Sequence, residues 1–179
     1  MSDIFYADKG VRVYPRSIAK IASLAGLFRL QNNEFVDKNG RIDMYRVLEK
    51  HALYNVLEDD LLPSNIEACS SQDGTILISE TTFNNLCDGQ HRARFTIAHE
   101  FGHIMLNHFS EISLNRGSEG EIKTFCNSEW QANEFAGWLL VDPLDLKTNA
   151  ALPIPLLSMK YGASNECIER RLSKLDKVL

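Results

Sequence analysis

Along four segments of the chain, apolar residues recur every three or four positions, which is the spacing of one face of an α-helix. Ser17 can cap the first of these helices, and Ser128-x-x-Gln131 has the form of a capping box before the fourth. Asp142-Pro143 should stop that last helix, because the residue before a proline disfavours helical backbone. The predicted helices cover residues 17–28, 43–54, 90–109 and 129–141.

Between the second and third of these segments, the pattern changes to short apolar and β-branched runs. Asp73-Gly74 separates the last two runs, and this dipeptide is favoured in tight hairpin turns because both central residues there need positive φ. We therefore expect an α+β fold that is mostly helical, with a small three-stranded antiparallel sheet. The predicted strands are 54–57, 66–69 and 75–79.

The end of the chain resembles a helix-turn-helix, with Gly162 in the turn and Ser164 capping the second helix. Acidic residues alternate with its basic ones, so no basic face for DNA emerges. We expect residues 1–150 to form one domain and residues 151–179 to form a C-terminal helical element. This element would either pack against the domain or bind a partner protein. The basic residues that could contact DNA are Arg170, Arg171, Lys174 and Lys177.

Composition excludes several classes of function. The 179 residues are 44% hydrophobic with a net charge of −5, which allows a globular core but gives no overall attraction to DNA or anionic membranes. Four cysteines without a C-x-x-C pair indicate free thiols in a reducing compartment. There is no signal-peptide pattern, and no stretch approaches the roughly 18 apolar residues of a membrane span. We expect a cytoplasmic protein that binds neither nucleic acid nor membranes directly.

The chemistry-bearing motif is H-E-x-x-H at residues 99–103, on the third predicted helix. At about 100° per residue, the imidazoles of His99 and His103 project from one face a turn apart, where both can bind one cation. Glu100 beside them can hold a water molecule and take its proton. The third histidine of this stretch, His108, is predicted to lie on the far side of the helix and outside the site.

A catalytic metal site of this kind needs a third protein ligand. The longer pattern H-E-x-x-H-x-x-G-x-x-H is excluded, because Leu106 and Phe109 stand where glycine and histidine are required. A carboxylate from the fourth predicted helix is the other option, and Glu129 and Glu134 are the two candidates.

Helix geometry favours Glu129 over Glu134. Glu129 shares one face with small alanines that allow a close approach to the metal helix, whereas Glu134 points about 140° away. Asn133 lies on the same face and can accept a hydrogen bond from a ligating histidine. The predicted metal ligands are therefore His99, His103 and Glu129. Zinc is the expected metal, and manganese or iron would suit the same ligands.

These parts predict peptide hydrolysis, with Glu100 as the general base that activates water and returns the proton to the leaving amine. The strand at 75–79 could supply a sheet edge to which an extended substrate adds, or it could lie inside the sheet with both edges covered. Tyr161 is a candidate for stabilising the oxyanion.

Two segments, 94–108 and 129–140, carry a resemblance to the ImmA/IrrE family of small metallopeptidases. The resemblance covers about residues 40–175. It implies that 1–150 form a gluzincin-like metallopeptidase domain with zinc held by His99, His103 and Glu129. It also implies a protein substrate, a co-encoded helix-turn-helix (Xre-type) repressor whose cleavage releases phage, mobile-element or stress-response genes.

Two other functions remain open at this point. One is a toxin- or regulator-like binding module that sequesters a repressor or antitoxin partner without cutting it and uses the metal mainly for structure. The other is direct regulation of transcription through the C-terminal element, which would show as salt-dependent DNA binding. The oligomeric state is not indicated by the sequence.

Overall fold

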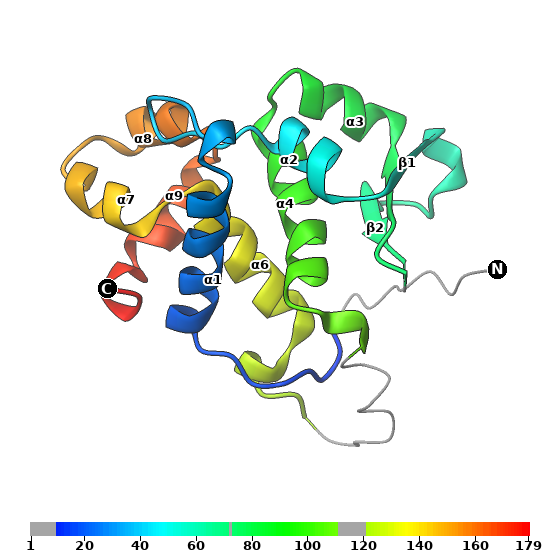
Figure 1. Cartoon of the computed structure of the whole chain (residues 1–179), viewed down its shortest axis with the longest axis horizontal. Helices are drawn as coiled ribbons and strands as arrows, with labels where there is room; N and C mark the ends of the chain where they lie inside the picture. The colour runs from blue at the N-terminus through cyan, green and yellow to red at the C-terminus, as the bar shows by residue number, and fades with distance from the viewer. Residues whose placement is uncertain (1–9, 72, 111–120) are drawn as a thin grey trace.

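The computed structural model describes residues 10–71, 73–110 and 121–179. Its fold is α+β and mostly helical, with a three-stranded sheet on one side of the helices (Figure 1). The helices are α1 (Ile18–Gln31), α2 (Met44–His51), α3 (Glu80–Cys87), α4 (His91–Met105), α6 (Ser128–Leu140), α7 (Pro143–Asn149), α8 (Ile154–Tyr161) and α9 (Asn165–Leu172). The strands are β1 (Tyr54–Leu57), β2 (Ala68–Ser70) and β3 (Ile76–Ser79).

The sheet is mixed, so the prediction of a purely antiparallel sheet was wrong. Its strand order is β1-β3-β2, with β2 antiparallel and β1 parallel to β3. β2 and β3 form the predicted hairpin, but of Asp73 and Gly74 only the glycine has a positive φ, of 82°, so the turn is not the type in which both residues do. The chain passes from β1 across to β2 and returns to β3 in the centre, so β1 and β3 run in the same direction. Apolar runs predict strands but do not show which strands become neighbours.

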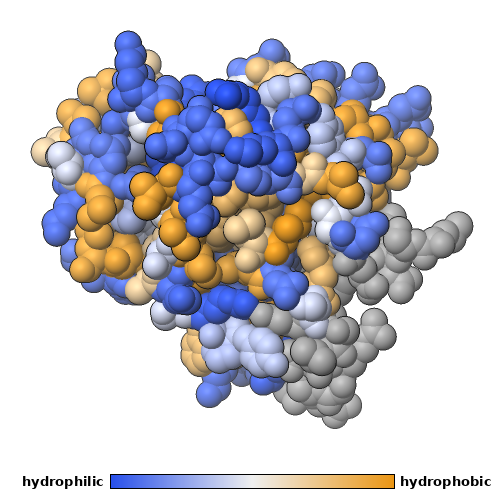
Figure 2. All heavy atoms as spheres, viewed as in Figure 1, coloured by the Kyte–Doolittle hydropathy of each residue, from blue (hydrophilic) through white to orange (hydrophobic). Residues whose placement is uncertain are grey.

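The core of the molecule is built around α6, which packs against both α1 and α4. Nearly all of α6 after Asn133 is buried, including the large side chains of Phe135 and Trp138. After Glu134 this helix is apolar on every side, which is typical of a position inside the core. On the face shown in Figure 2, apolar patches lie among hydrophilic residues. Leu30 of α1 and Leu144 of α7 are among the exposed large apolar residues.

The backbones of α4 and α6 approach closely at Gly102. A Cβ atom added there would lie 3.2 Å from the Cα and the carbonyl oxygen of Ala132. We predict that Gly102→Ala lowers the free energy of unfolding by about 1–3 kcal/mol, because the two helices must move apart. Gly26 of α1 is the matched control: nothing lies within 4 Å of an added Cβ.

We expect Gly26→Ala to raise the free energy of unfolding by up to about 1 kcal/mol, because alanine is the better helix former. Urea denaturation measures both variants. If Gly102→Ala and Gly26→Ala had the same free energy of unfolding, the close approach of α4 and α6 at Gly102 would not restrict the size of this residue.

The first described residues run beside the segment that leads into α6. Three backbone N–H groups of residues 11–16 donate hydrogen bonds to residues 125–128. The pairs are Val11 N to Ser128 Oγ (3.0 Å), Val13 N to Cys126 O (2.9 Å) and Arg16 N to Phe125 O (3.0 Å). The start of α6 is therefore fastened to a segment more than a hundred residues away in the sequence.

This contact also changes how α6 begins. Asn127 is the N-cap, because its side-chain oxygen accepts from the backbone N–H of Trp130 at 3.0 Å. The predicted capping box of Ser128 and Gln131 was wrong, because the Ser128 hydroxyl accepts from Val11 instead. The predicted N-cap Ser17 of α1 is confirmed by its bond from Lys20 N.

At the C-terminal end, α8 and α9 flank Gly162, whose φ of 60° ends α8 in the left-handed region. Ser164 caps α9 as predicted. Arg171, one of the residues considered for DNA contact, is buried against α6 and pairs with Glu134. Within the described ranges, none of the helices is both long enough and apolar enough to cross a membrane.

Candidate metal centre

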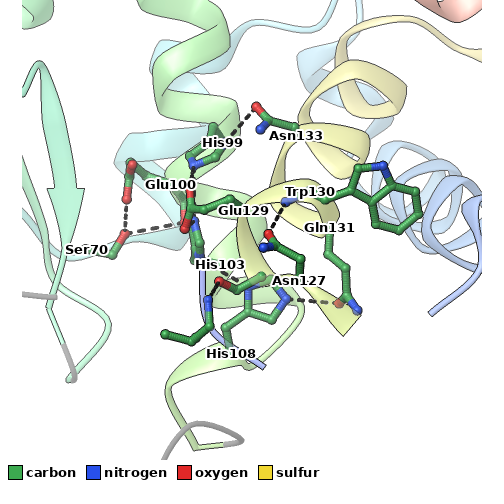
Figure 3. A network of polar contacts seen from close by, with 12 residues as sticks. Ser70, His99, Glu100, His103, His108, Asn127, Glu129, Trp130, Gln131 and Asn133 are labelled. Atoms are coloured by element: carbon green, nitrogen blue, oxygen red, sulfur yellow. Dashed lines mark hydrogen bonds and ion pairs between the residues drawn. The ribbon is translucent and has the colours of Figure 1, made fainter. Parts of the chain in front are cut away.

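The structure brings His99 and His103 of α4 together with Glu129 of α6 (Figure 3). One ligand atom from each residue lies within 4.8 Å of the others. The two histidine Nε2 atoms are 3.1 Å apart, and they lie 3.1 and 3.3 Å from the two carboxylate oxygens of Glu129. Ligands at about 2.0–2.1 Å from a tetrahedral zinc ion are about 3.3 Å from one another, so the spacing fits such an ion.

Asn133 orients the first histidine. Its Oδ1 lies 3.1 Å from His99 Nδ1, on the side of the ring away from the cluster. The sequence predicted this contact, because Asn133 follows Glu129 by about one turn of α6. A proton on Nδ1 leaves the Nε2 lone pair of His99 for a cation.

Glu129 is ionised in this environment. Burial by itself would raise the pKa of Glu129, but its contacts with the side chains of His103 and His99 outweigh this effect and bring the pKa well below its usual value. A carboxylate must be deprotonated to bind a metal. The cluster therefore offers a negatively charged carboxylate to a cation.

Glu100 lies on the wall of a cavity of about 330 Å³ beside the cluster. Its side chain is mostly buried, and Ser70 Oγ donates a 2.7 Å hydrogen bond to its Oε2. Ser70 ends β2, so this strand holds the carboxylate of Glu100 in place. Ser70 could not be predicted from the sequence, because nothing local connects a serine at a strand end with a helix thirty residues later.

The strand that borders this cavity is β2. It is an edge strand of the sheet, and Ala68, Cys69 and Ser70 line the cavity. Of the two positions considered for the strand at 75–79, the structure shows the internal one, because β3 occupies the centre of the sheet.

His108 does not lie on the far side of α4, so that prediction was wrong as well. The helix ends at Met105, and Asn107 takes a left-handed φ of 55°, which turns the chain back. The ring of His108 is fully buried, with its Nδ1 3.0 Å from Nδ1 of His103. Burial, followed by the charge of His103, lowers the pKa of His108 to about 3.

Two other residues that the sequence suggested for the site, Tyr161 and Glu134, lie outside the cluster. Tyr161 is buried, and its hydroxyl donates to Asp145 Oδ2 at 2.8 Å rather than facing the cavity, so it cannot stabilise an oxyanion there. Glu134, the alternative carboxylate, bonds to Arg171 and Lys174.

The orientation of His99 can be tested through Asn133. We expect Asn133→Ala to weaken zinc binding by about 10- to 100-fold, because the imidazole loses the partner that fixes its ring and tautomer. Asn133 is exposed, so the thermal stability of the metal-free protein should hardly change. Competition with a chelator measures the affinity, and the exposed Asn84→Ala in α3 is the control. Equal zinc affinity in both variants would remove this role from Asn133.

A histidine pair on one helix that faces a carboxylate on a second helix, beside a buried glutamate, is an arrangement with which metallopeptidases bind a metal ion. Residues 75–173 match the model of the Peptidase_M78 family, described as the IrrE N-terminal-like domain. The chain therefore belongs to this family, which confirms the resemblance to the ImmA/IrrE metallopeptidases.

The fold is also similar to the solved structure of a Mycobacterium tuberculosis transcriptional regulator, with a TM-score of 0.58 and 17% sequence identity. The match covers 89% of this chain and 52% of that one, so this chain spans about half the length of the regulator. At this identity the likeness concerns the fold alone. No curated protein matches the chain.

Proposed function

We propose that the protein is a metal-dependent endopeptidase in which His99, His103 and Glu129 bind zinc. The observation that carries this proposal is the convergence of these three side chains next to Glu100, in the lining of a cavity bordered by an edge strand. Membership of the Peptidase_M78 family supports it. Manganese and iron suit the same ligands, so metal analysis of the purified protein is needed to identify the ion.

Glu100 is the proposed general base. When bound, the metal supplies a Lewis acid that polarises the scissile carbonyl and acidifies water. Ser70 holds Oε2 of Glu100 and so fixes the orientation of the carboxylate. The carboxylate accepts a proton from the attacking water and then returns it to the nitrogen of the leaving amine.

The proposed substrate is an extended segment of a co-encoded helix-turn-helix (Xre-type) repressor, whose cleavage would release phage, mobile-element or stress-response genes. β2 offers an edge to which an extended chain can add as a strand. The net charge of −5 complements the basic surface of a DNA-binding protein.

The experiment is to mix the protein with the repressor encoded beside it, with zinc and with a chelator. We expect fragments of defined mass with zinc and intact repressor with the chelator. A stable complex that produces no fragments under either condition would instead establish a binding module that sequesters its partner.

A further inference from the structure

A chain of hydrogen bonds runs behind His103, away from the cavity (Figure 3), and it begins at Gln131. The Gln131 Nε2 donates to the backbone carbonyls of Tyr14 and Phe125, each at 2.8 Å. Its Oε1 accepts from Nη1 of Arg16 at 2.9 Å. Carbonyl oxygens only accept and a guanidinium only donates, so the surroundings leave one orientation for this amide.

The orientation of Gln131 determines where the proton of His108 lies. The same Oε1 is 3.1 Å from His108 Nε2, and an amide oxygen can only accept, so Nε2 carries the hydrogen. The ring is fully buried, and its two nitrogens contact an amide oxygen and another imidazole, without a carboxylate on either. A buried ring with such partners is neutral, so its Nδ1 is an acceptor.

The partner of that acceptor is His103 Nδ1, at 3.0 Å. We propose that Gln131 and His108 are positioning residues that hold His103 in the tautomer with its proton on Nδ1. The lone pair of His103 Nε2 then faces the other two candidate ligands. This inference rests on the proposed metal site, and it adds how one of its ligands is prepared for a cation.

The two histidines of the cluster are thus oriented by different means. His99 has an exposed amide as its partner, whereas His103 is backed by a buried imidazole and a buried amide that use both of their hydrogen-bonding ends. Arg16 adds a second bond, from Nη2 to the carbonyl of Leu106 at the end of α4, at 2.9 Å. This bond ties the amide of α6 to the helix that carries the histidines.

The tautomers can be measured directly by long-range 15N–1H correlation spectra of the full-length wild-type protein at pH 8, loaded with zinc and after metal removal. We expect the proton of His108 on Nε2 and that of His103 on Nδ1 in both states. A His108 proton on Nδ1, or a shift of the His103 proton to Nε2 on metal removal, would overturn the proposal. No variant is needed, so the result does not depend on a mutant folding.

A pair of variants separates positioning from packing. Asn at 108 keeps an acceptor near the position of Nδ1, whereas Leu removes it. We expect His108→Leu to lose about 10- to 100-fold in zinc affinity, and His108→Asn to retain most of the wild-type affinity, by chelator competition. Equal losses in the two variants, or none in His108→Leu, would assign His108 to packing alone.

Thermal unfolding of the metal-free variants shows whether each one folds. These measurements use zinc and no substrate, so a protein that cut no repressor would contradict the proposed function and leave this inference standing.

Discussion

Glu100→Gln is expected to lower the rate of repressor cleavage by about 10²- to 10⁴-fold while metal content and fold stay unchanged. Glutamine has the shape of glutamate but cannot take a proton from water. Its amide oxygen can still accept the hydrogen bond from Ser70, so the side chain should keep its place on the cavity wall. The measurement is the rate of fragment formation with zinc present, alongside metal analysis of the purified variant.

Glu34→Gln is the matched control, because it makes the same change in an exposed residue outside the cavity. It should cleave at the wild-type rate. Wild-type cleavage by Glu100→Gln would exclude Glu100 as the base, and loss of zinc from this variant would place Glu100 among the ligands instead.

The second large effect concerns stability. Glu134 and Arg171 form an ion pair at 2.9 Å in which both side chains are at most 4% exposed, and Lys174 bonds to the same carboxylate. The guanidinium also lies over the ring of Trp138, 4.7 Å from its centroid. We expect Glu134→Ala to lower the free energy of unfolding by about 3–5 kcal/mol, because it leaves a buried cation without its anion.

Urea denaturation tests this prediction against Glu166→Ala, which breaks the exposed pair with Arg170 on the same helix α9. That control should change the free energy of unfolding by less than about 0.5 kcal/mol. The double variant Glu134→Leu/Arg171→Met should recover much of the loss, since it removes the unpaired charge. If Glu134→Ala and Glu166→Ala changed the free energy of unfolding equally, the buried ion pair would not be what holds α9 against α6.

Features that depend on a few consecutive residues were predictable from the sequence. The 3.6-residue period placed the histidines of H-E-x-x-H on one face, and the same argument placed Glu129 and Asn133 together on α6. The hairpin at Asp73-Gly74 was predicted from this dipeptide, and Gly74 takes the positive φ that glycine allows. The roles of His99, His103, Glu129 and Glu100 in binding and catalysis stay predictions.

Features that depend on distant segments were not predictable. The direction of β1 relative to β3 depends on where the chain crosses the sheet, and the apolar pattern does not record this. His108 was misplaced because α4 ends at a left-handed asparagine, with neither glycine nor proline to mark the turn. Gln131 was assigned to a helix cap, whereas the carbonyls that hold its side chain come from Tyr14 and Phe125.

The bonds between the N-terminal segment and α6 determine when the centre can form. Arg16 and Gln131 are 115 positions apart, so the first leaves the ribosome long before the second has been made. Chains are synthesised at about 5–20 residues per second, so several seconds separate the two. Toward the end of that interval α4 has been made and can carry its histidines, but it still lacks both the carboxylate of Glu129 and the support behind His103. A nascent chain is therefore expected to be inactive until α6 has emerged and the segment at 11–16 has closed over its start.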